Sequence, residues 1–255
     1  MCGIAGILNI KAQTKELRDK ALKMAQKIRH RGPDWSGIYV GGSAILAHER
    51  LSIVDPQSGG QPLYSPDRKQ VLAVNGEIYN HREIRTRYAG KYDFQTGSDC
   101  EVILALYKDK GIHFLEDISG IFAFVLYDEE KDEFLIARDP IGVIPLYIGR
   151  DKDGKIYFGS ELKALEGFCD EYELFLPGHY YYSKEGQMKR WYARDWTEYE
   201  TVKDNDAKAG DVKEALEDAV HRQTYRNRRS KRCMVASTSL LCYRSERCTR
   251  FDKST

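Results

Sequence analysis

The sequence predicts an α+β fold in which antiparallel sheets are covered by helices. Three observations support this prediction. They are the many short apolar or β-branched runs between Gly, Pro and Asp turns, two hairpin patterns, and two amphipathic helices. A sheet with one apolar face needs another layer to bury that face, and an amphipathic helix supplies such a layer. We expect this domain to cover residues 2–196.

The first helix is predicted after Thr14, whose hydroxyl group suits a helix N-cap. Gly32-Pro33 ends this helical region. Short strands are expected next, at residues 43–47, 51–54 and 70–74, because these runs are apolar or β-branched and lie between turn residues. The apolar stripe of the helix follows helical spacing and consists of Leu17, Ala21, Met24 and Ile28.

A second helix is predicted at Ser98-Asp99-Cys100-Glu101, which fits a capping box. Val102, Ile103 and Leu106 supply its buried stripe. Two hairpins follow in the sequence, because two pairs of strand-like runs each enclose a short charged turn. The first hairpin pairs residues 121–127 with 134–137 around a turn at 128–132, and the second pairs 180–183 with 187–192 around Lys184-Glu185-Gly186.

Charge is distributed unevenly along the chain. The 255 residues include 40 Lys and Arg against 39 Asp and Glu, which suggests a nearly neutral protein. Residues 222–255, however, hold ten basic and two acidic side chains. This tail therefore has a net charge of +8, and residues 1–221 have a net charge of −7. The chain has two distinct compositions.

The part of the chain after residue 196 is predicted to hold three segments. Residues 197–211 are polar and charged without an apolar period, so we expect a linker. Residues 212–223 form an amphipathic helical pattern, which we interpret as the first helix of a second domain. Residues 224–255 have no clear apolar period and contain no glycine, so we expect an irregular, basic and disordered tail.

Several classes of protein are excluded by composition. The longest apolar run near the middle of the chain, residues 121–127, is too short to cross a bilayer, and Met1–Leu8 lacks the basic region and cleavage site of a signal peptide. We therefore expect a cytoplasmic protein with reduced cysteines and no membrane partner. The basic tail has no recognisable nucleic-acid-binding fold, so no nucleic-acid partner is expected. No metal site is expected either, because paired spacing is lacking in Cys233, Cys242 and Cys248.

Cys2 is the first candidate for chemistry. Removal of Met1, which a small following residue permits, leaves a free α-amino group beside the thiol of Cys2. The reference pKa of such an amine is about 7.7–8.0 and that of the thiol about 8.5, so one residue supplies both a nucleophile and a base. Gly3 lets the backbone approach a ligand closely. The alternative is a buried cysteine that acts as a small apolar side chain.

Asn75-Gly76 is a candidate oxyanion hole. A thiolate that attacks a carbonyl needs donors for the developing oxyanion, and the Asn75 amide and the Gly76 backbone N–H are suitable. This dipeptide follows the strand-like run 71–74, so we expect it at a strand end. The alternative is a hairpin turn, because Asn-Gly is the strongest short-range turn signal.

Three charged residues are candidates for holding a polar substrate. Arg50 has a planar fork that suits a carboxylate, and Asp99 together with Glu77 suits an ammonium group. The alternatives are a surface arginine and carboxylates that favour the start of a helix. Residue type alone leaves both interpretations open.

Seven stretches of the sequence occur in the order found in one enzyme family. They are Met1-Cys2-Gly3-Ile4-Ala5-Gly6, Arg29-His30-Arg31-Gly32-Pro33-Asp34, His48-Glu49-Arg50-Leu51-Ser52-Ile53-Val54, Gly60-Gln61-Pro62, Asn75-Gly76-Glu77-Ile78-Tyr79-Asn80, Thr96-Gly97-Ser98-Asp99 and Ala137-Arg138-Asp139-Pro140-Ile141-Gly142. Together they resemble the class II, N-terminal-nucleophile glutamine amidotransferases. With Ser160-Glu161-Leu162-Lys163-Ala164-Leu165, they are most similar to glutamine-hydrolysing asparagine synthetase of the bacterial type. The resemblance covers roughly residues 1–223.

The resemblance implies a four-layer αββα sandwich and a glutaminase with L-glutamine as substrate. Cys2 would form a glutamyl thioester, with Asn75 and Gly76 as the oxyanion hole. Arg50 would hold the glutamine carboxylate, and Glu77 and Asp99 its ammonium group. The resemblance also implies a possible homodimer, no cofactor for the glutaminase step, and ATP and Mg²⁺ for asparagine synthesis in the full-length family. The backbone that would line the pocket belongs to Leu51, Ser52, Ile53 and Val54.

The sequence departs from this family after residue 223. The family continues with an apolar strand and a pyrophosphate-binding loop, and residues 224–255 show neither. We therefore expect the ATP and Mg²⁺ site to be absent here, and hypothesise a frameshift or truncation at Thr224. Two alternatives stay open: a glutaminase that serves another acceptor, in an amino-sugar or purine pathway, and an inactive frameshifted product.

Overall fold

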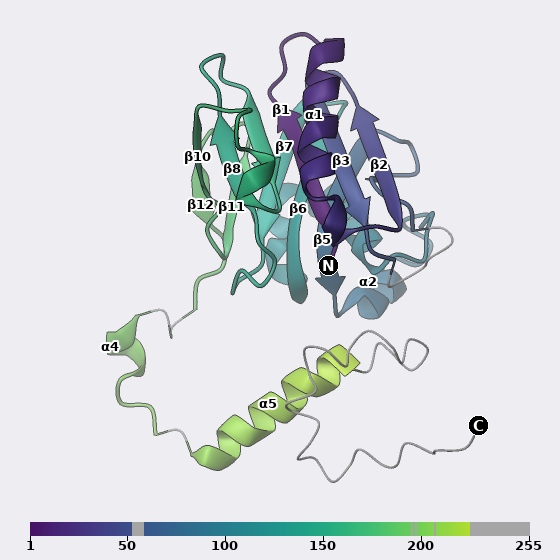
Figure 1. Cartoon of the computed structure of the whole chain (residues 1–255). Coiled ribbons are helices and arrows are strands. Elements are labelled where there is room, and N and C mark those ends of the chain that lie inside the picture. Colours follow the sequence, from purple (N-terminus) through teal and green to yellow (C-terminus); the bar gives the residue numbers. More distant parts are fainter. Residues whose placement is uncertain (53–58, 195, 197, 207, 225–255) are drawn as a thin grey trace, which may run out of the picture. The chain divides into compact units, whose positions relative to one another are not determined.

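A computed structural model of the chain describes residues 1–52, 59–194, 196, 198–206 and 208–224. The chain divides into two compact units, Met1–Asn205 and Asp206–Thr255. The first unit contains two antiparallel sheets of six strands each (Figure 1). The predicted α+β class is therefore confirmed.

The first sheet has the strand order β10-β8-β9-β1-β3-β2. The inner strands β1 and β3 are buried along their whole length, whereas the edge strand β10 is exposed. The N-terminus of the chain leads directly into β1, so the residues before it lie at the end of a central strand. The bounds are β1 Gly3–Leu8, β2 Trp35–Val40, β3 Ala44–Arg50, β8 Tyr147–Arg150, β9 Ile156–Gly159 and β10 Glu171–Leu174.

The second sheet has the strand order β12-β11-β7-β6-β5-β4. Its two longest strands, β5 and β6, pair along their full length from Gln70↔Asp128 to Ile78↔Gly120. Both predicted hairpins lie in this sheet and are confirmed, as β6–β7 and β11–β12. The bounds are β4 Leu63–Tyr64, β5 Gln70–Ile78, β6 Gly120–Asp128, β7 Glu133–Arg138, β11 His179–Tyr182 and β12 Met188–Arg190.

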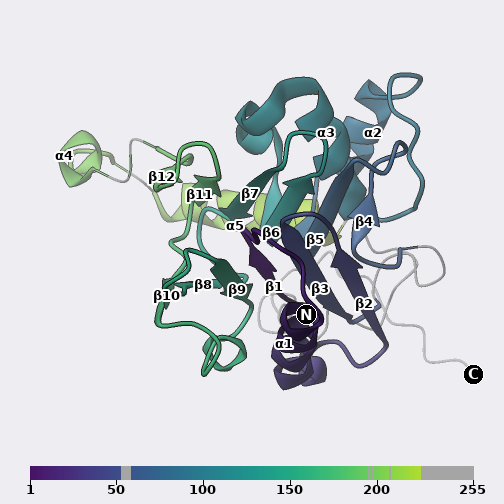
Figure 2. The same ribbon diagram turned by 90° about the horizontal axis from the view of Figure 1, so that it is seen from above.

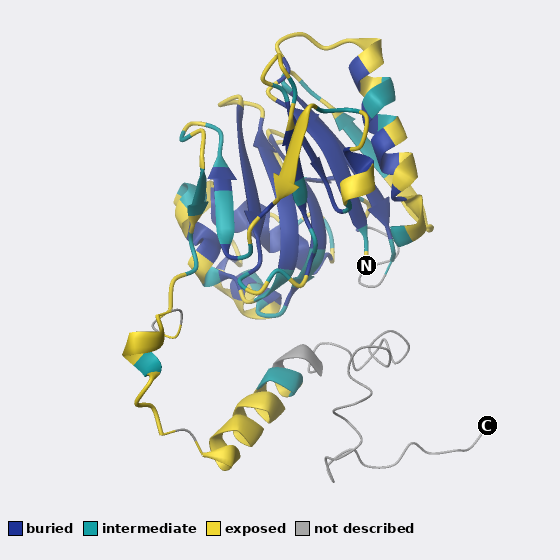
Figure 3. Cartoon of the chain, turned by 60° about the vertical axis from the view of Figure 1, so that its left-hand side comes forward, coloured by how far each residue is buried: buried dark blue, intermediate teal, exposed yellow. Residues whose placement is uncertain are grey.

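Helices cover the outer face of each sheet. Helix α1 (Lys15–Lys27) packs on the first sheet, and helices α2 (His81–Arg87) and α3 (Val102–Lys110) pack on the second. Figure 2 shows the four layers in order, from α1 through the two sheets to α2 and α3. An apolar cluster joins the two sheets face to face, and Figure 3 shows that most of the inner strands are buried, whereas the edge strands β2 and β10 of the first sheet are not. The predicted αββα sandwich is therefore confirmed.

The predicted helix caps are confirmed in part. Thr14 Oγ1 accepts the Leu17 N–H at 3.2 Å, as an N-cap does. Ser98 Oγ accepts the Cys100 N–H at 3.3 Å, but Glu101 does not complete a capping box. The Ser98 N–H is taken by Thr96 Oγ1, and Glu101 instead accepts the N–H groups of residues 95 and 96. A 3₁₀ turn at Asp99–Glu101 then leads into α3.

Two strand predictions are corrected by the structure. The strand predicted at 51–54 is not found at Leu51 and Ser52, which follow the end of β3 at Arg50, and residues 53 and 54 lie outside the described residues. Strand β5 continues through Asn75-Gly76 to Ile78, so this dipeptide is neither a hairpin turn nor a strand end. Pairing with β6 overrides the local turn preference there. Strands β1, β2, β4, β8, β9 and β10 are not predicted from the sequence.

The second unit contains helix α5, Ala209–Thr224, where the sequence predicts a helix over 212–223. Asp211 lies inside this helix, and its carboxylate accepts the Lys208 N–H at 3.0 Å. The predicted linker includes a short helix, α4 (Tyr199–Val202). The tail predicted at 224–255 lies outside the described residues from residue 225 onward.

No helix in the part of the chain that the structure describes has the length and apolar character needed to cross a membrane.

Candidate active site

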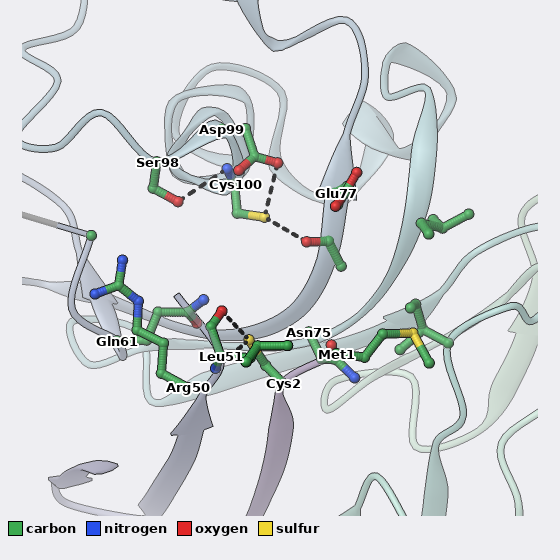
Figure 4. Close-up of a pocket in the computed structure, with 14 residues that line it drawn as sticks. Met1, Cys2, Arg50, Leu51, Gln61, Asn75, Glu77, Ser98, Asp99 and Cys100 are labelled. Carbon is green, nitrogen blue, oxygen red and sulfur yellow. Dashed lines mark hydrogen bonds between the residues drawn. The ribbon is translucent and has the colours of Figure 1, made fainter. Parts of the chain in front are cut away.

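A pocket opens where the start of β1, the end of β3 and the last residues of β5 meet the turn before α3. It encloses about 600 Å³, counted together with the solvent at its mouth. Figure 4 shows Cys2, Arg50 and Asn75 on one side of the pocket, and Ser98, Asp99 and Glu77 on the other. The lining residues are Met1, Cys2, Arg50, Leu51, Gly59, Gln61, Asn75, Gly76, Glu77, Ser98, Asp99, Cys100, Ile121 and Ile144.

The pocket brings together most of the residues singled out in the sequence. Seven of these residues line it, and they come from four separate segments of the chain. Ser52 does not line it, and its N–H is bonded to the Asp34 carboxylate at 2.8 Å. Ile53 and Val54 lie outside the described residues. The seven lining residues are Cys2, Arg50, Leu51, Asn75, Gly76, Glu77 and Asp99.

The thiol of Cys2 is held against the backbone of Leu51. The Leu51 N–H donates to Cys2 Sγ at 3.3 Å, and the thiol can donate to the Leu51 carbonyl at 3.5 Å. Burial raises the pKa of the Cys2 thiol, while the Leu51 N–H, the N-terminal ammonium and two arginines, Arg50 and Arg31, partly offset this effect. The thiol is thus positioned at the pocket, but it needs a base to ionise near neutral pH.

The backbone groups of Gly76 face away from β6. Phe122, which lies opposite Gly76, uses its N–H and its carbonyl for the carboxylate and the N–H of Asp139, on the other side of β6. Gly76 and Phe122 therefore form a non-hydrogen-bonded pair, and the N–H and carbonyl of Gly76 point to the outer edge of β5. By the same alternation, the backbone groups of Val74 and Ile78 also point to this edge. Their N–H groups accordingly donate to the side chains of Gln61 and Asp99.

Asn75 presents a donor without a partner. Its side chain is 1% exposed, and Nδ2 has no hydrogen-bond partner among the described residues. A buried unpaired amide is costly, so its presence at a pocket is typical of a group that serves a ligand. Glycine is required next to it, because a Cβ on Gly76 would lie 2.3 Å from the carbonyl oxygen of Ile121.

One cation and two carboxylates line the same pocket. Arg50 is 6% and Asp99 is 4% exposed, and Glu77 is half-buried. The Asp99 carboxylate is oriented by the Ile78 N–H at 2.8 Å and lies 3.5 Å from Cys100 Sγ. A zwitterion of amino-acid size finds a complementary charge for each of its two groups here.

Sequence reasoning missed several residues of the site. Gln61, Ser98 and Cys100 line the pocket, and all three lie inside or next to motifs that were noticed in the sequence. Ile144 also lines it, and its N–H is held by Asp139, which accepts four successive N–H groups from residues 141–144. The motif around Asp139 therefore has a structural role, because it shapes a pocket wall.

The whole domain is similar to a known family. A family model described as "Glutamine amidotransferase domain" matches residues 1–191. Asparagine synthetase B [glutamine-hydrolyzing] of Escherichia coli (strain K12) is 55% identical over 220 residues. That match covers 86% of this chain and 40% of the E. coli protein. A probable asparagine synthetase [glutamine-hydrolyzing] of Dictyostelium discoideum is 48% identical over 226 residues, which cover 86% of this chain and 41% of that protein.

A solved structure shares the fold. Glutamine phosphoribosylpyrophosphate amidotransferase from B. subtilis, complexed with ADP and GMP, superimposes with a TM-score of 0.64 at 23% identity. The superposition covers 76% of this chain and 50% of that one. The chain spans about 40% of the length of the curated relatives it matches. Its sequence is similar to the amidotransferase part of the asparagine synthetases, and the chain belongs to the glutamine amidotransferase domain family.

Proposed function

We propose that this chain hydrolyses L-glutamine to glutamate and ammonia, with Cys2 as the nucleophile. One observation carries the proposal: the Cys2 thiol and the unpartnered Asn75 amide line the same pocket. A nucleophile and an unsatisfied donor are the two groups that acyl transfer from a carboxamide requires.

Removal of Met1, a residue that lines the pocket and is 54% exposed, must precede the reaction. The nitrogen of Cys2 then becomes a free α-amine and takes the thiol proton. The thiolate forms a bond to the carboxamide carbon of glutamine, and the carbonyl electrons move onto its oxygen. When this intermediate collapses, the departing nitrogen takes the proton from the α-ammonium and leaves as ammonia.

A γ-glutamyl thioester on Cys2 remains after ammonia has left. Water attacks this thioester with the α-amine again as base, which releases glutamate and restores the thiol. Both steps pass through an oxyanion. The Asn75 Nδ2 and the Gly76 N–H are its proposed donors, supported by the unpaired Nδ2 and by the direction of the Gly76 backbone.

The charged side chains orient the substrate in this proposal. Arg50 binds the α-carboxylate of glutamine through its bidentate fork. Glu77 and Asp99 bind the α-ammonium group, and their placement in the pocket supports this role. The backbone of Leu51, Ile53 and Val54 is proposed to line the pocket around the substrate; the presence of Leu51 in the pocket wall supports this, and Ile53 and Val54 lie outside the described residues.

Use of the ammonia for asparagine synthesis is a proposal for a longer protein. Such a reaction requires ATP and Mg²⁺ to activate aspartate. The described residues include no group of three or more His, Cys, Asp or Glu side chains that could hold a metal ion, so we assign no Mg²⁺ site to them. Every step of the proposed glutamine hydrolysis uses the side chains of this chain, its α-amino and backbone N–H groups, and water.

The test is a glutaminase assay on the whole chain, with intact-mass analysis to verify removal of Met1. We expect ammonia and glutamate in equal amounts from the wild type, and only background from Cys2→Ala. Cys169→Ala is the matched control, because this cysteine does not line the pocket and should leave turnover unchanged. A processed wild type without turnover, or an active Cys2→Ala variant, contradicts the proposal.

A further inference from the structure

Two side chains hold the outer edge of β5 beside Asn75. Strand β4 pairs only with Val71 and Leu72, and no other described strand pairs with this edge. The N–H of Val74 donates to Gln61 Oε1 at 2.9 Å, and the carbonyl of Val74 accepts from His48 Nε2 at 3.0 Å. Both backbone groups of Val74 are thus satisfied by side chains where a strand would otherwise bind.

His48 makes this contact across the two sheets. It lies on β3 in the first sheet, whereas Val74 lies on β5 in the second, and Figure 2 shows these strands in adjacent layers. His48 is fully buried. Because its Nε2 donates to a carbonyl, its Nδ1 carries the lone pair, and Nδ1 has no partner among the described residues.

The charge state of His48 suits a fixed donor. Burial lowers the pKa of His48 to about 3, with a smaller contribution from Arg50, even though the bond to Val74 acts in the opposite direction. His48 is therefore neutral at physiological pH and keeps one tautomer. A proton-transfer role is disfavoured by this pKa, whereas a constant hydrogen bond is favoured.

A histidine at this position is costly if it serves only to fill space. A buried imidazole with one unpaired nitrogen loses its hydration, and an apolar side chain of similar size avoids that loss. The donated hydrogen bond is what distinguishes His48 from such a side chain. Its acceptor is one end of the Val74–Asn75 peptide, so the bond acts directly on the backbone of Asn75.

Gln61 completes the contact from the pocket side. Its backbone is packed against Gly37 of β2, where a Cβ would lie 1.8 Å from the Gln61 carbonyl oxygen. Figure 4 shows Gln61 beside Arg50 at the pocket wall. The side chain is therefore supported by the first sheet, as His48 is, while it bonds to the second.

We infer that His48 and Gln61 are positioning residues, which hold the Val74 backbone and thereby set the Asn75 amide and the Gly76 N–H relative to Cys2. This inference rests on the proposed glutaminase function. Donors to an oxyanion act only when they are held close to its position in the transition state. Loss of either contact should therefore slow turnover more than it weakens substrate binding.

The test compares side chains of equal length in the whole chain. His48→Gln keeps a donor near the position of Nε2, and His48→Met removes it. We expect His48→Met to lower kcat by roughly tenfold with KM changed by less than about twofold. His48→Gln should recover kcat to within about threefold of the wild type. Alkylation of Cys2 by iodoacetamide needs no oxyanion hole, so its rate should stay the same in both variants.

The outcomes separate the inference from the function it rests on. A wild type that does not hydrolyse glutamine overturns the proposed function. A wild type that does, together with equal kcat values for His48→Met and the wild type, overturns the inference. Equal losses of kcat in His48→Met and His48→Gln overturn the inference as well, because they would show that His48 contributes only packing and not a hydrogen bond.

A second pair of variants serves if His48→Met does not fold. Gln61→Glu keeps an oxygen acceptor for the Val74 N–H, and Gln61→Met removes it. We expect a loss of kcat in Gln61→Met that Gln61→Glu recovers in part, and the absence of any such difference contradicts the role of Gln61.

Nitrogen-15 NMR of the wild type should show the Nε2–H tautomer of His48 between pH 8 and pH 5, and a protonated or Nδ1–H form overturns the assignment of His48 as a donor to Val74.

Discussion

Arg31 Nε donates a hydrogen bond of 2.9 Å to the carbonyl oxygen of Cys2. The same guanidinium is paired at 3.0 Å with Glu161, which also contacts His30 at 3.0 Å. Burial opposes ionisation of Glu161, but hydrogen bonds from Arg31 and Lys163 outweigh it and lower the pKa of Glu161 to about 2. The backbone of the proposed nucleophile is therefore tied to a charged pair that persists at neutral pH.

Removal of this contact should impair turnover. Arg31→Met leaves the Cys2 carbonyl without its donor, and we expect kcat to fall roughly tenfold because the nucleophile is less well oriented. Arg18→Met is the matched control, since Arg18 is exposed on α1 and does not line the pocket. Steady-state glutaminase kinetics measure both variants, and equal kcat values for them would show that Arg31 does not position Cys2.

Asn75→Ala should separate activity from stability. Loss of one oxyanion donor is expected to lower kcat by roughly 100-fold or more. The free energy of unfolding should change by less than about 1 kcal/mol, because Nδ2 has no partner to lose among the described residues. Glutaminase assays and urea unfolding measure the two quantities. A large loss of stability with little loss of kcat contradicts the role of Asn75.

Arg50 should control the affinity for glutamine. Arg50→Met removes the proposed partner of the substrate carboxylate, so we expect KM to rise roughly 100-fold. Arg50→Lys keeps the charge but not the bidentate fork, and an intermediate KM is expected. The alkylation rate of Cys2 by iodoacetamide, which has no α-carboxylate, reports whether the pocket is intact. A normal KM in Arg50→Met would remove Arg50 from the binding site.

His48 should make the stability of the wild type fall in acid. Its pKa is about 3 in the folded chain and about 6.5 in the unfolded chain, so the unfolded state binds a proton first. The contribution of neutral His48 is fully present above pH 6.5 and is lost as the pH falls toward 3, by up to about 5 kcal/mol. In His48→Gln, the free energy of unfolding should depend less on pH between pH 6.5 and pH 4 than it does in the wild type. The same pH dependence of the free energy of unfolding in both proteins would contradict a lowered pKa of His48.

Gly76→Ala should destabilise the domain. The new Cβ would lie 2.3 Å from the Ile121 carbonyl oxygen and 2.6 Å from Phe122 Cα, so β5 and β6 must separate. We expect a loss of roughly 2 kcal/mol or more in the free energy of unfolding. Gly60→Ala is the matched control, because nothing lies within 4 Å of its Cβ position. Thermal unfolding measures both variants, and equal midpoints would show that the strands accommodate the methyl group.

Local sequence patterns predicted the elements that local forces build. Thr14 caps α1, and the β6–β7 hairpin forms around its charged turn, because both depend on residues close in sequence. Local patterns failed at Asn75-Gly76, where nine paired positions between β5 and β6 outweigh a two-residue turn preference. They also missed the short strands β8, β9 and β10, since a four-residue strand has too few residues to show alternation.

The sequence by itself determined the family and the identity of the candidate residues, because the chemistry of Cys2, Arg50 and Asp99 belongs to their side chains. Only the tertiary structure decided that these residues share one pocket and that Gly76 turns its N–H to the outer edge of β5. The physical reason is register. Which backbone groups of a strand face outward depends on the hydrogen bonds of its neighbour, here those of Phe122 to Asp139, and these join residues far apart in the sequence.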